Sequence, residues 1–177
     1  MSTPELSRIV KVRPVPADAL LIEATDAERA ALAARFGLAE IAQLTASVAL
    51  EERQAVVYAT GSMRAAIIQL CAVSSDEFPV MIDEPINLRF VRETTLQSRT
   101  TDEGEIEVEL ELEDSDEIEF SGDTFDLGEA IAQTLGLAID PYAEGPNADQ
   151  VRRQAGISDE GAPSGPLAEA LAALKKG

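Results

Sequence analysis

Histidine and tryptophan are absent from this chain of 177 residues, and cysteine occurs once. Without histidine the chain cannot build a histidine general base, a histidine-oriented nucleophile or a histidine metal site. Most hydrolase triads and histidine zinc centres are thereby excluded. A single cysteine also cannot form an intramolecular disulfide, which suits a reducing cytosol.

Positive charge is scarce as well. Lys and Arg number 14 against 33 Asp and Glu, so the formal net charge is −19. A field of this sign repels phosphate backbones, which proteins bind largely through lysine and arginine. We therefore expect no DNA binding and no broad electrostatic binding of RNA.

Long apolar runs are missing too. No stretch of about eighteen apolar residues occurs, and Met1 to Pro14 lacks the apolar core of a signal peptide. These features predict a cytoplasmic protein with no membrane partner. Hydrophobic residues still make up 45% of the chain and aromatic residues 4%, which predicts a folded domain with an aliphatic core.

The N-terminal third predicts two short strands and a helix. The strands are expected at Ser7 to Val12 and at Leu20 to Ala24. Thr25 followed three residues later by Glu28 has the spacing of a capping box. We therefore expect a helix over Asp26 to Phe36 that leans on a sheet.

The middle of the chain, Ile41 to Val91, alternates with a period near two and predicts about four antiparallel strands. Turns are expected at Glu51 to Gln54 and at Gly61-Ser62. Arg64 to Val73 has few polar interruptions, which predicts a central strand buried on both faces, although a short helix would give a similar run. Pro85 places the following strand at an edge or a bulge.

Residues 102–119 form an acidic segment with eleven carboxylates and no Lys or Arg. Glu105 to Leu112 alternates strictly between glutamate and aliphatic residues, which predicts a strand flanked by acidic loops. Two interpretations stay open: a solvated edge that prevents strand-to-strand aggregation, or a surface that binds a basic protein or imitates nucleic-acid charge. The candidate partner-binding acids are Glu105, Glu107, Glu109, Glu111, Glu113, Asp114, Asp116, Glu117 and Glu119.

The C-terminal third predicts a helix over Asp126 to Ala138, again started by a capping spacing, and then a flexible linker over 143–165. A short helix is expected within 166–177. It is too short to persist alone in water, so it must dock on this chain or on a partner. Its candidate anchoring residues are Leu167, Leu171 and Leu174.

These elements predict a single α+β domain over 5–142. A curled antiparallel sheet, an open-barrel-like meander, would pack with two helices, and a tail with a short helix would follow. Cys71 is expected to be a protonated structural thiol in an apolar strand, because no His or Lys nearby lowers its pKa. No phosphate-loop pattern or EF-hand spacing occurs, so no cofactor or metal is predicted.

Three stretches, in the same order and with similar spacing, resemble the YceD family of bacterial large ribosomal RNA subunit accumulation proteins. They are "GSMRAAIIQLCAV" (Gly61 to Val73), "EIEFSGDTFDLGEAIAQTLGLAIDPY" (Glu117 to Tyr142) and "SGPLAEALAALKKG" (164–177). The resemblance implies a non-enzymatic role in 23S rRNA accumulation and large ribosomal subunit biogenesis. It supplies no catalytic residue.

The chain departs from the family pattern at three places. Ser74 stands where many relatives have a second cysteine, so a metal site built on that pair would be absent. Ala143-Glu144 follows Tyr142 where a basic residue is common, and Pro166-Leu167 replaces Pro-Phe.

Three functions follow as hypotheses. The first is an accessory factor that holds a basic ribosomal protein or assembly factor on its acidic surface and reaches rRNA only indirectly. The second is direct RNA contact through a local basic patch. The third, an enzyme using paired carboxylates, lacks any visible pair with separated pKa values. The residues of the alternative RNA patch are Arg8, Lys11, Arg13, Arg89 and Arg92.

Overall fold

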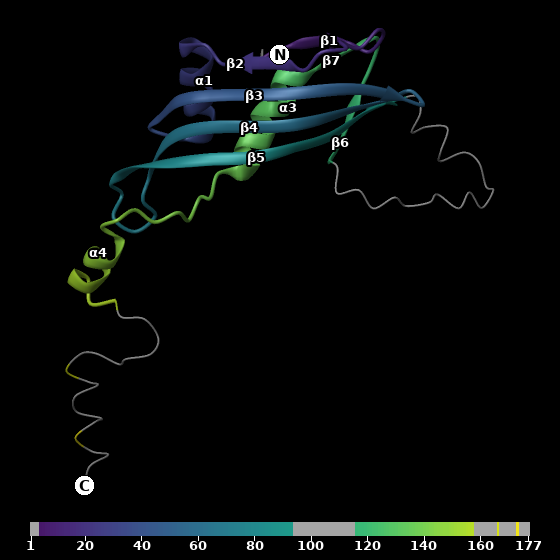
Figure 1. The fold of residues 1–177 in the computed structure, drawn as a ribbon. Helices are drawn as coiled ribbons and strands as arrows, with labels where there is room; N and C mark the ends of the chain where they lie inside the picture. The colour runs from purple at the N-terminus through teal and green to yellow at the C-terminus, as the bar shows by residue number, and fades with distance from the viewer. Residues whose placement is uncertain (1–3, 94–115, 158–165, 167–172, 174–177) are drawn as a thin grey trace.

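A computed structural model describes residues 4–93 and 116–157, together with Pro166 and Ala173. Its main feature is a curled five-stranded sheet that does not close into a barrel (Figure 1). A second sheet pairs β1 (Ile9–Lys11) with β7 (Thr124–Asp126). The predicted α+β class is confirmed. The strands of the main sheet, in spatial order, are β2 (Leu20–Glu23), β3 (Glu40–Arg53), β4 (Val56–Leu70), β5 (Glu77–Arg92) and β6 (Asp116–Phe120).

The main sheet is mixed, whereas the sequence predicts a wholly antiparallel one. β2 to β5 are antiparallel, but β6 lies parallel to β5, from Leu88 opposite Asp116 to Arg92 opposite Phe120. A parallel pair needs a long crossover rather than a hairpin. The stretch 94–115 between β5 and β6 provides that length.

Three long strands, β3 to β5, occupy the region for which the sequence predicts about four. Gly61 and Ser62 lie inside β4 rather than in a turn. A Cβ at Gly61 would lie 1.9 Å from the carbonyl oxygen of Ser47, so glycine is required by the close approach of β3. The β3–β4 hairpin turns instead at Gln54 and Ala55, whose φ values of 51° and 66° suit a type I′ turn.

β4 is the central strand, as predicted, but it is not buried on both faces. Its side chains alternate, with Met63, Ala65 and Ile67 buried and the residues between them more exposed. Pro85 lies where β5 has no partner beyond β4 among the described residues, because β6 pairs only from Leu88 onward. Pro85 therefore lies on a stretch of β5 whose outer side is unpaired among the described residues, although β5 itself lies between β4 and β6.

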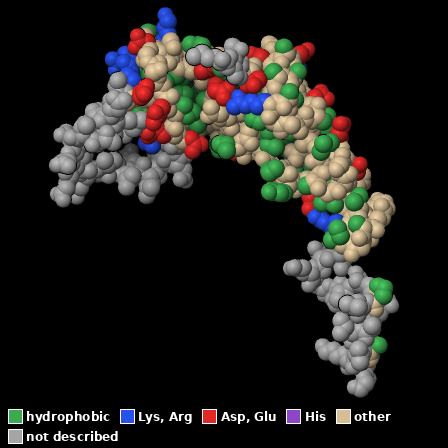
Figure 2. All heavy atoms as spheres, turned by 180° about the vertical axis from the view of Figure 1, so that it is seen from behind, with side chains coloured by type: hydrophobic (Ala, Val, Ile, Leu, Met, Phe, Trp, Pro, Cys, Tyr) green, Lys and Arg blue, Asp and Glu red, His purple; other side chains and the backbone are tan. Residues whose placement is uncertain are grey.

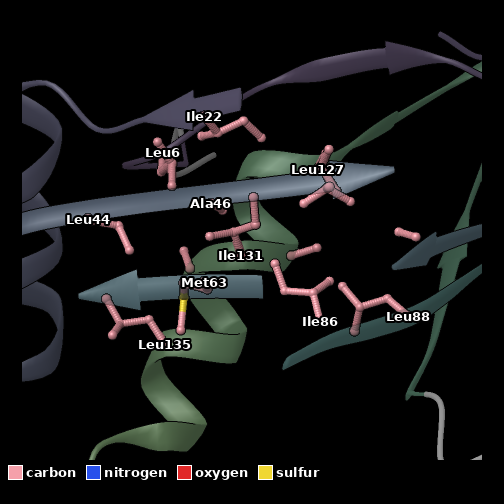
Figure 3. Close-up of a cluster of buried hydrophobic side chains, with 14 of the residues drawn as sticks. Leu6, Ile22, Leu44, Ala46, Met63, Ile86, Leu88, Leu127, Ile131 and Leu135 are labelled. Carbon is pink, nitrogen blue, oxygen red and sulfur yellow. The ribbon is translucent and has the colours of Figure 1, made fainter. Parts of the chain in front are cut away.

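Both long helices pack on one face of the main sheet. The capping box of α1 (Asp26–Phe36) is formed as predicted, and Asp126 caps α3 (Leu127–Ala138). The helices meet where the ring of Phe36 leaves no room for a Cβ at Gly136. No described helix is long and apolar enough to cross a membrane. Figure 3 shows the core between α3 and the sheet, which includes Leu44, Met63, Ile86, Leu127, Ile131 and Leu135.

The range predicted as a linker, 143–165, contains a third helix, α4 (Ala148–Gln154). Ala148 is buried against Cys71 and Phe78 in a small cluster beside the main core. The start of this range is therefore packed on the domain. The helix predicted around Leu167, Leu171 and Leu174 falls outside the described residues.

Candidate interaction surface

The described end of the acidic segment is β6. Asp116 and Glu119 are exposed and have no ion pair with any described residue, while Glu117 pairs with Arg89 at 3.3 Å. β6 therefore adds two carboxylates at the edge of the sheet that no described cation neutralises. The other predicted partner-binding residues lie outside the described residues: Glu105, Glu107, Glu109, Glu111, Glu113, Asp114, Leu167, Leu171 and Leu174.

Nearly all described basic side chains are already bound to carboxylates of the same chain. Of the eleven described Lys and Arg residues, nine form ion pairs, which leaves Lys11 and Arg153. Figure 2 shows carboxylates spread over one face, with cationic side chains in only a few places. The paired arginines are Arg8, Arg13, Arg29, Arg35, Arg53, Arg64, Arg89, Arg92 and Arg152.

The structure brings together only three of the five residues predicted to form an RNA patch. Lys11, Arg13 and Arg92 line one hollow of about 380 Å³ with Asp123 and Thr124. Within it, Arg92 pairs with Asp123 at 3.3 Å, and Arg13 pairs with a glutamate on β3 at 2.6 Å. A phosphate entering the hollow would therefore compete with carboxylates for two of its three cations.

Arg8 and Arg89, the other two residues of that predicted patch, have structural roles. Arg8 donates to both carboxylate oxygens of Glu28, at 2.6 and 3.0 Å, and to the carbonyl oxygen of Glu23. These contacts join the first strand to the start of α1. Arg89 is held by Glu117 across β5 and β6. Neither is a free cation for RNA.

Cys71 lies in the turn after β4, not inside a strand as predicted, and it is 2% exposed. Its Sγ accepts hydrogen bonds from the backbone N–H groups of Ser74, at 3.3 Å, and Val73, at 3.4 Å. Hydrogen bonds from the Ser74 hydroxyl and from the N–H groups of Ser74, Gly145 and Val73 lower the thiol pKa to about 7, despite burial. The expectation that nothing lowers this pKa is wrong, because the donors come from the turn and from a distant segment.

The part of the chain that the structure describes contains no candidate metal centre. No group of three or more His, Cys, Asp or Glu side chains among them could hold a metal ion. The burial of Cys71 also limits access to its sulfur.

Comparison with protein-family models, with curated proteins and with solved structures gave no match for this chain. The YceD resemblance therefore remains a prediction from the motifs. Inference about function has to start from the charge, burial and packing of the described residues.

Proposed function

We propose that this chain is a non-enzymatic accessory factor for 23S rRNA accumulation and large ribosomal subunit biogenesis. It would hold a basic ribosomal protein or a basic assembly factor on its acidic surface. The observation that carries the proposal is the pairing of nine of the eleven described cations with internal carboxylates. The link to ribosome assembly comes from the motif resemblance.

This charge arrangement favours a basic protein over RNA as the direct partner. Phosphate binding depends on free Lys and Arg side chains, and here most of them would first have to leave a carboxylate. A basic protein instead meets acids such as Asp116 and Glu119, which have no ion pair with a described residue, in a molecule of net charge −19. Complementary charge of this kind speeds association and selects the partner. Contact with rRNA would then be indirect, through the bound protein.

Direct RNA contact stays as the alternative, since the hollow with Lys11, Arg13 and Arg92 gathers three cations. It has less support, because two of the three are ion-paired there. This alternative requires that the chain bind an RNA oligonucleotide. It also requires that Lys11→Gln weaken that binding.

The first test neutralises the acidic segment. Replacing Glu105, Glu107, Glu109 and Glu111 by Gln should weaken binding to purified basic proteins of the large subunit about tenfold at low salt, through loss of electrostatic attraction. The salt dependence of Kd should also become shallower. Fluorescence anisotropy at several salt concentrations measures both quantities.

The matched control removes four negative charges elsewhere. Asp18, Glu23, Glu84 and Asp149 are replaced by their amides, and this variant should keep most of the affinity. Equal Kd values and equal salt dependence for the wild-type chain and the acidic-segment variant would contradict the proposal. Normal 23S rRNA levels in cells depleted of the protein would contradict the role in accumulation.

A further inference from the structure

One face of the main sheet is open. Figure 1 shows α3 crossing a single face of the sheet, and α1 packs on the same side through its contact with α3. No described helix or strand covers the opposite face. An exposed face of an antiparallel sheet is ordinarily polar, so apolar side chains on it need an explanation.

Five side chains on this open face form a continuous apolar surface where β4 ends and β5 begins. Ile68 lies opposite Pro79, Ala66 lies opposite Met81, and Leu70 follows on β4. Met81 is 74% exposed and Leu70 is 50% exposed. We call Ala66, Ile68, Leu70, Pro79 and Met81 the apolar patch. Contiguous exposed apolar residues inside a polar margin mark an interaction site more often than scattered ones do.

Two carboxylates lie beside the apolar patch, one on β3 and one at the start of β5. Glu40 on β3 lies opposite Ile68, and Glu77 on β5 lies opposite Leu70. Both glutamates are exposed, and neither has an ion pair with a described residue. Toward the middle of the sheet, Arg64 and Asp83 form a neutral pair at 2.9 Å that bounds the patch. One carboxylate therefore lies on each side of the line from Leu70 to Met81, and a neutral pair bounds the patch at one end.

We infer that the apolar patch binds an amphipathic segment of a basic partner protein, with an apolar stripe flanked on each side by Lys or Arg. This inference rests on the proposed function and gives it a docking place on the folded domain. The stripe would cover Leu70 and Met81, and the flexible Met81 side chain adapts readily to a partner surface. Its cations would meet Glu40 and Glu77, which sets orientation and association rate.

Two other occupants fit the patch less well. In the C-terminal segment, both lysines, Lys175 and Lys176, come after the last leucine, so they lie at one end of the leucine-containing stretch. Glu169 lies between the leucines. That arrangement does not match acids on two sides. A second copy would place its own glutamates against Glu40 and Glu77, and like charges across an interface are unfavourable.

The test uses the full chain and a fluorescein-labelled synthetic peptide that forms an amphipathic helix, with leucines along one side and lysines on both margins. A peptide of the same composition in scrambled order is the reference. The double variant Leu70→Ser/Met81→Ser should bind the patterned peptide about tenfold more weakly, because its apolar contact is lost. Leu21→Ser/Leu137→Ser, at positions 84% and 81% exposed, is the matched control and should bind as the wild-type chain does.

The acidic margin is tested separately. Glu40→Gln/Glu77→Gln should weaken binding of the patterned peptide at low salt and have little effect at high salt, since screening removes the same attraction. Equal binding of the patterned and scrambled peptides, or wild-type affinity in Leu70→Ser/Met81→Ser, would overturn the inference. Tighter peptide binding after Leu167, Leu171 and Leu174 are replaced by Ser would show that the chain's own C-terminal segment occupies the patch, which also overturns it.

The two proposals can fail independently. If the binding of basic ribosomal proteins depends on Glu105 to Glu111 but not on Leu70 and Met81, the proposed function stands and the inferred docking site is wrong. If the patterned peptide depends on Leu70 and Met81 while no basic ribosomal protein binds the chain, the patch stands as a docking site and the proposed function is wrong.

Discussion

At the scale of single residues, two carboxylates organise the junction between the N-terminal strand and the helices. Asp126 accepts hydrogen bonds from the Ser7 hydroxyl at 2.6 Å and from the Arg8 N–H at 2.8 Å, and it also caps α3. Glu28 caps α1 through Thr25 and binds Arg8. One short stretch of chain is thereby fixed to the N-termini of both helices.

Glu28 is expected to make stability depend on pH. The hydrogen bond from Arg8, aided by the backbone and hydroxyl of Thr25, lowers the Glu28 pKa to about 2. The carboxylate therefore stabilises the fold fully above the unfolded glutamate pKa of about 4.3, and this contribution is lost as pH falls toward 2. Glu28→Gln should lower the free energy of unfolding by about 1–2 kcal/mol at pH 7, with the difference vanishing near pH 2. Urea denaturation at several pH values measures it.

The control for this prediction is Glu40→Gln, an exposed carboxylate with no ion pair among the described residues. It should leave the free energy of unfolding within about 0.5 kcal/mol of the wild-type value at each pH. A Glu28→Gln variant whose deficit stays constant from pH 7 to pH 2 would show that the ion pair with Arg8 does not contribute as described.

At the scale of elements, β4 depends on the absence of a side chain at Gly61. Gly61→Ala would place a methyl group 1.9 Å from the carbonyl oxygen of Ser47, so β3 and β4 would have to separate. We expect a loss of at least about 2 kcal/mol in the free energy of unfolding, measured by urea denaturation. The neighbouring exposed change Ser62→Ala should cost less than about 0.5 kcal/mol. Equal stability of the two variants would contradict this account of the glycine.

Elements with local signals could be predicted from the sequence, and those set by distant contacts could not. The bounds of α1 follow from Thr25, Glu28 and Gly37, all within or beside the helix. The hairpin turn at Gln54-Ala55 lacks the usual Asn or Gly, so the sequence places it only approximately, at Glu51 to Gln54. The sequence predicts a turn at Gly61, because the segment that requires glycine there, around Ser47 on β3, gives no local signal. The parallel direction of β6 likewise depends on how a long connection returns to β5.

At the scale of the whole molecule, the excess of negative charge should oppose compaction. The chain carries a net charge of −19, and its surface ion pairs contribute little each. Raising NaCl from about 10 mM to about 300 mM should therefore increase Tm, because screening weakens self-repulsion more than it weakens the pairs. Thermal unfolding followed by circular dichroism measures this.

A less acidic variant supplies the control for the salt effect. The chain with Glu105, Glu107, Glu109 and Glu111 replaced by Gln has less repulsion to screen, so its Tm should rise less with salt. A Tm that falls with added NaCl in the wild-type chain would mean that ion pairs such as Arg35 with Glu129 outweigh the repulsion.

The candidate surface was only partly visible in the sequence. Composition alone predicts an acidic surface, because net charge does not depend on the fold. The apolar patch was not predicted, since Leu70 and Met81 come together only through the register of β4 and β5. The predicted basic patch does not form as a unit, also because of contacts between distant segments. Arg8 and Arg89 form ion pairs with carboxylates on neighbouring elements.

The pairing of β1 with β7 bears on how the molecule is made. Ser7 and Asp126 are 119 residues apart in the sequence, yet they are hydrogen-bonded in the finished domain. During translation, the first strand must therefore wait for its partner to leave the ribosome, and contacts of this range close slowly. Until then the nascent chain has an unfinished core, and exposed apolar surface of this kind favours aggregation.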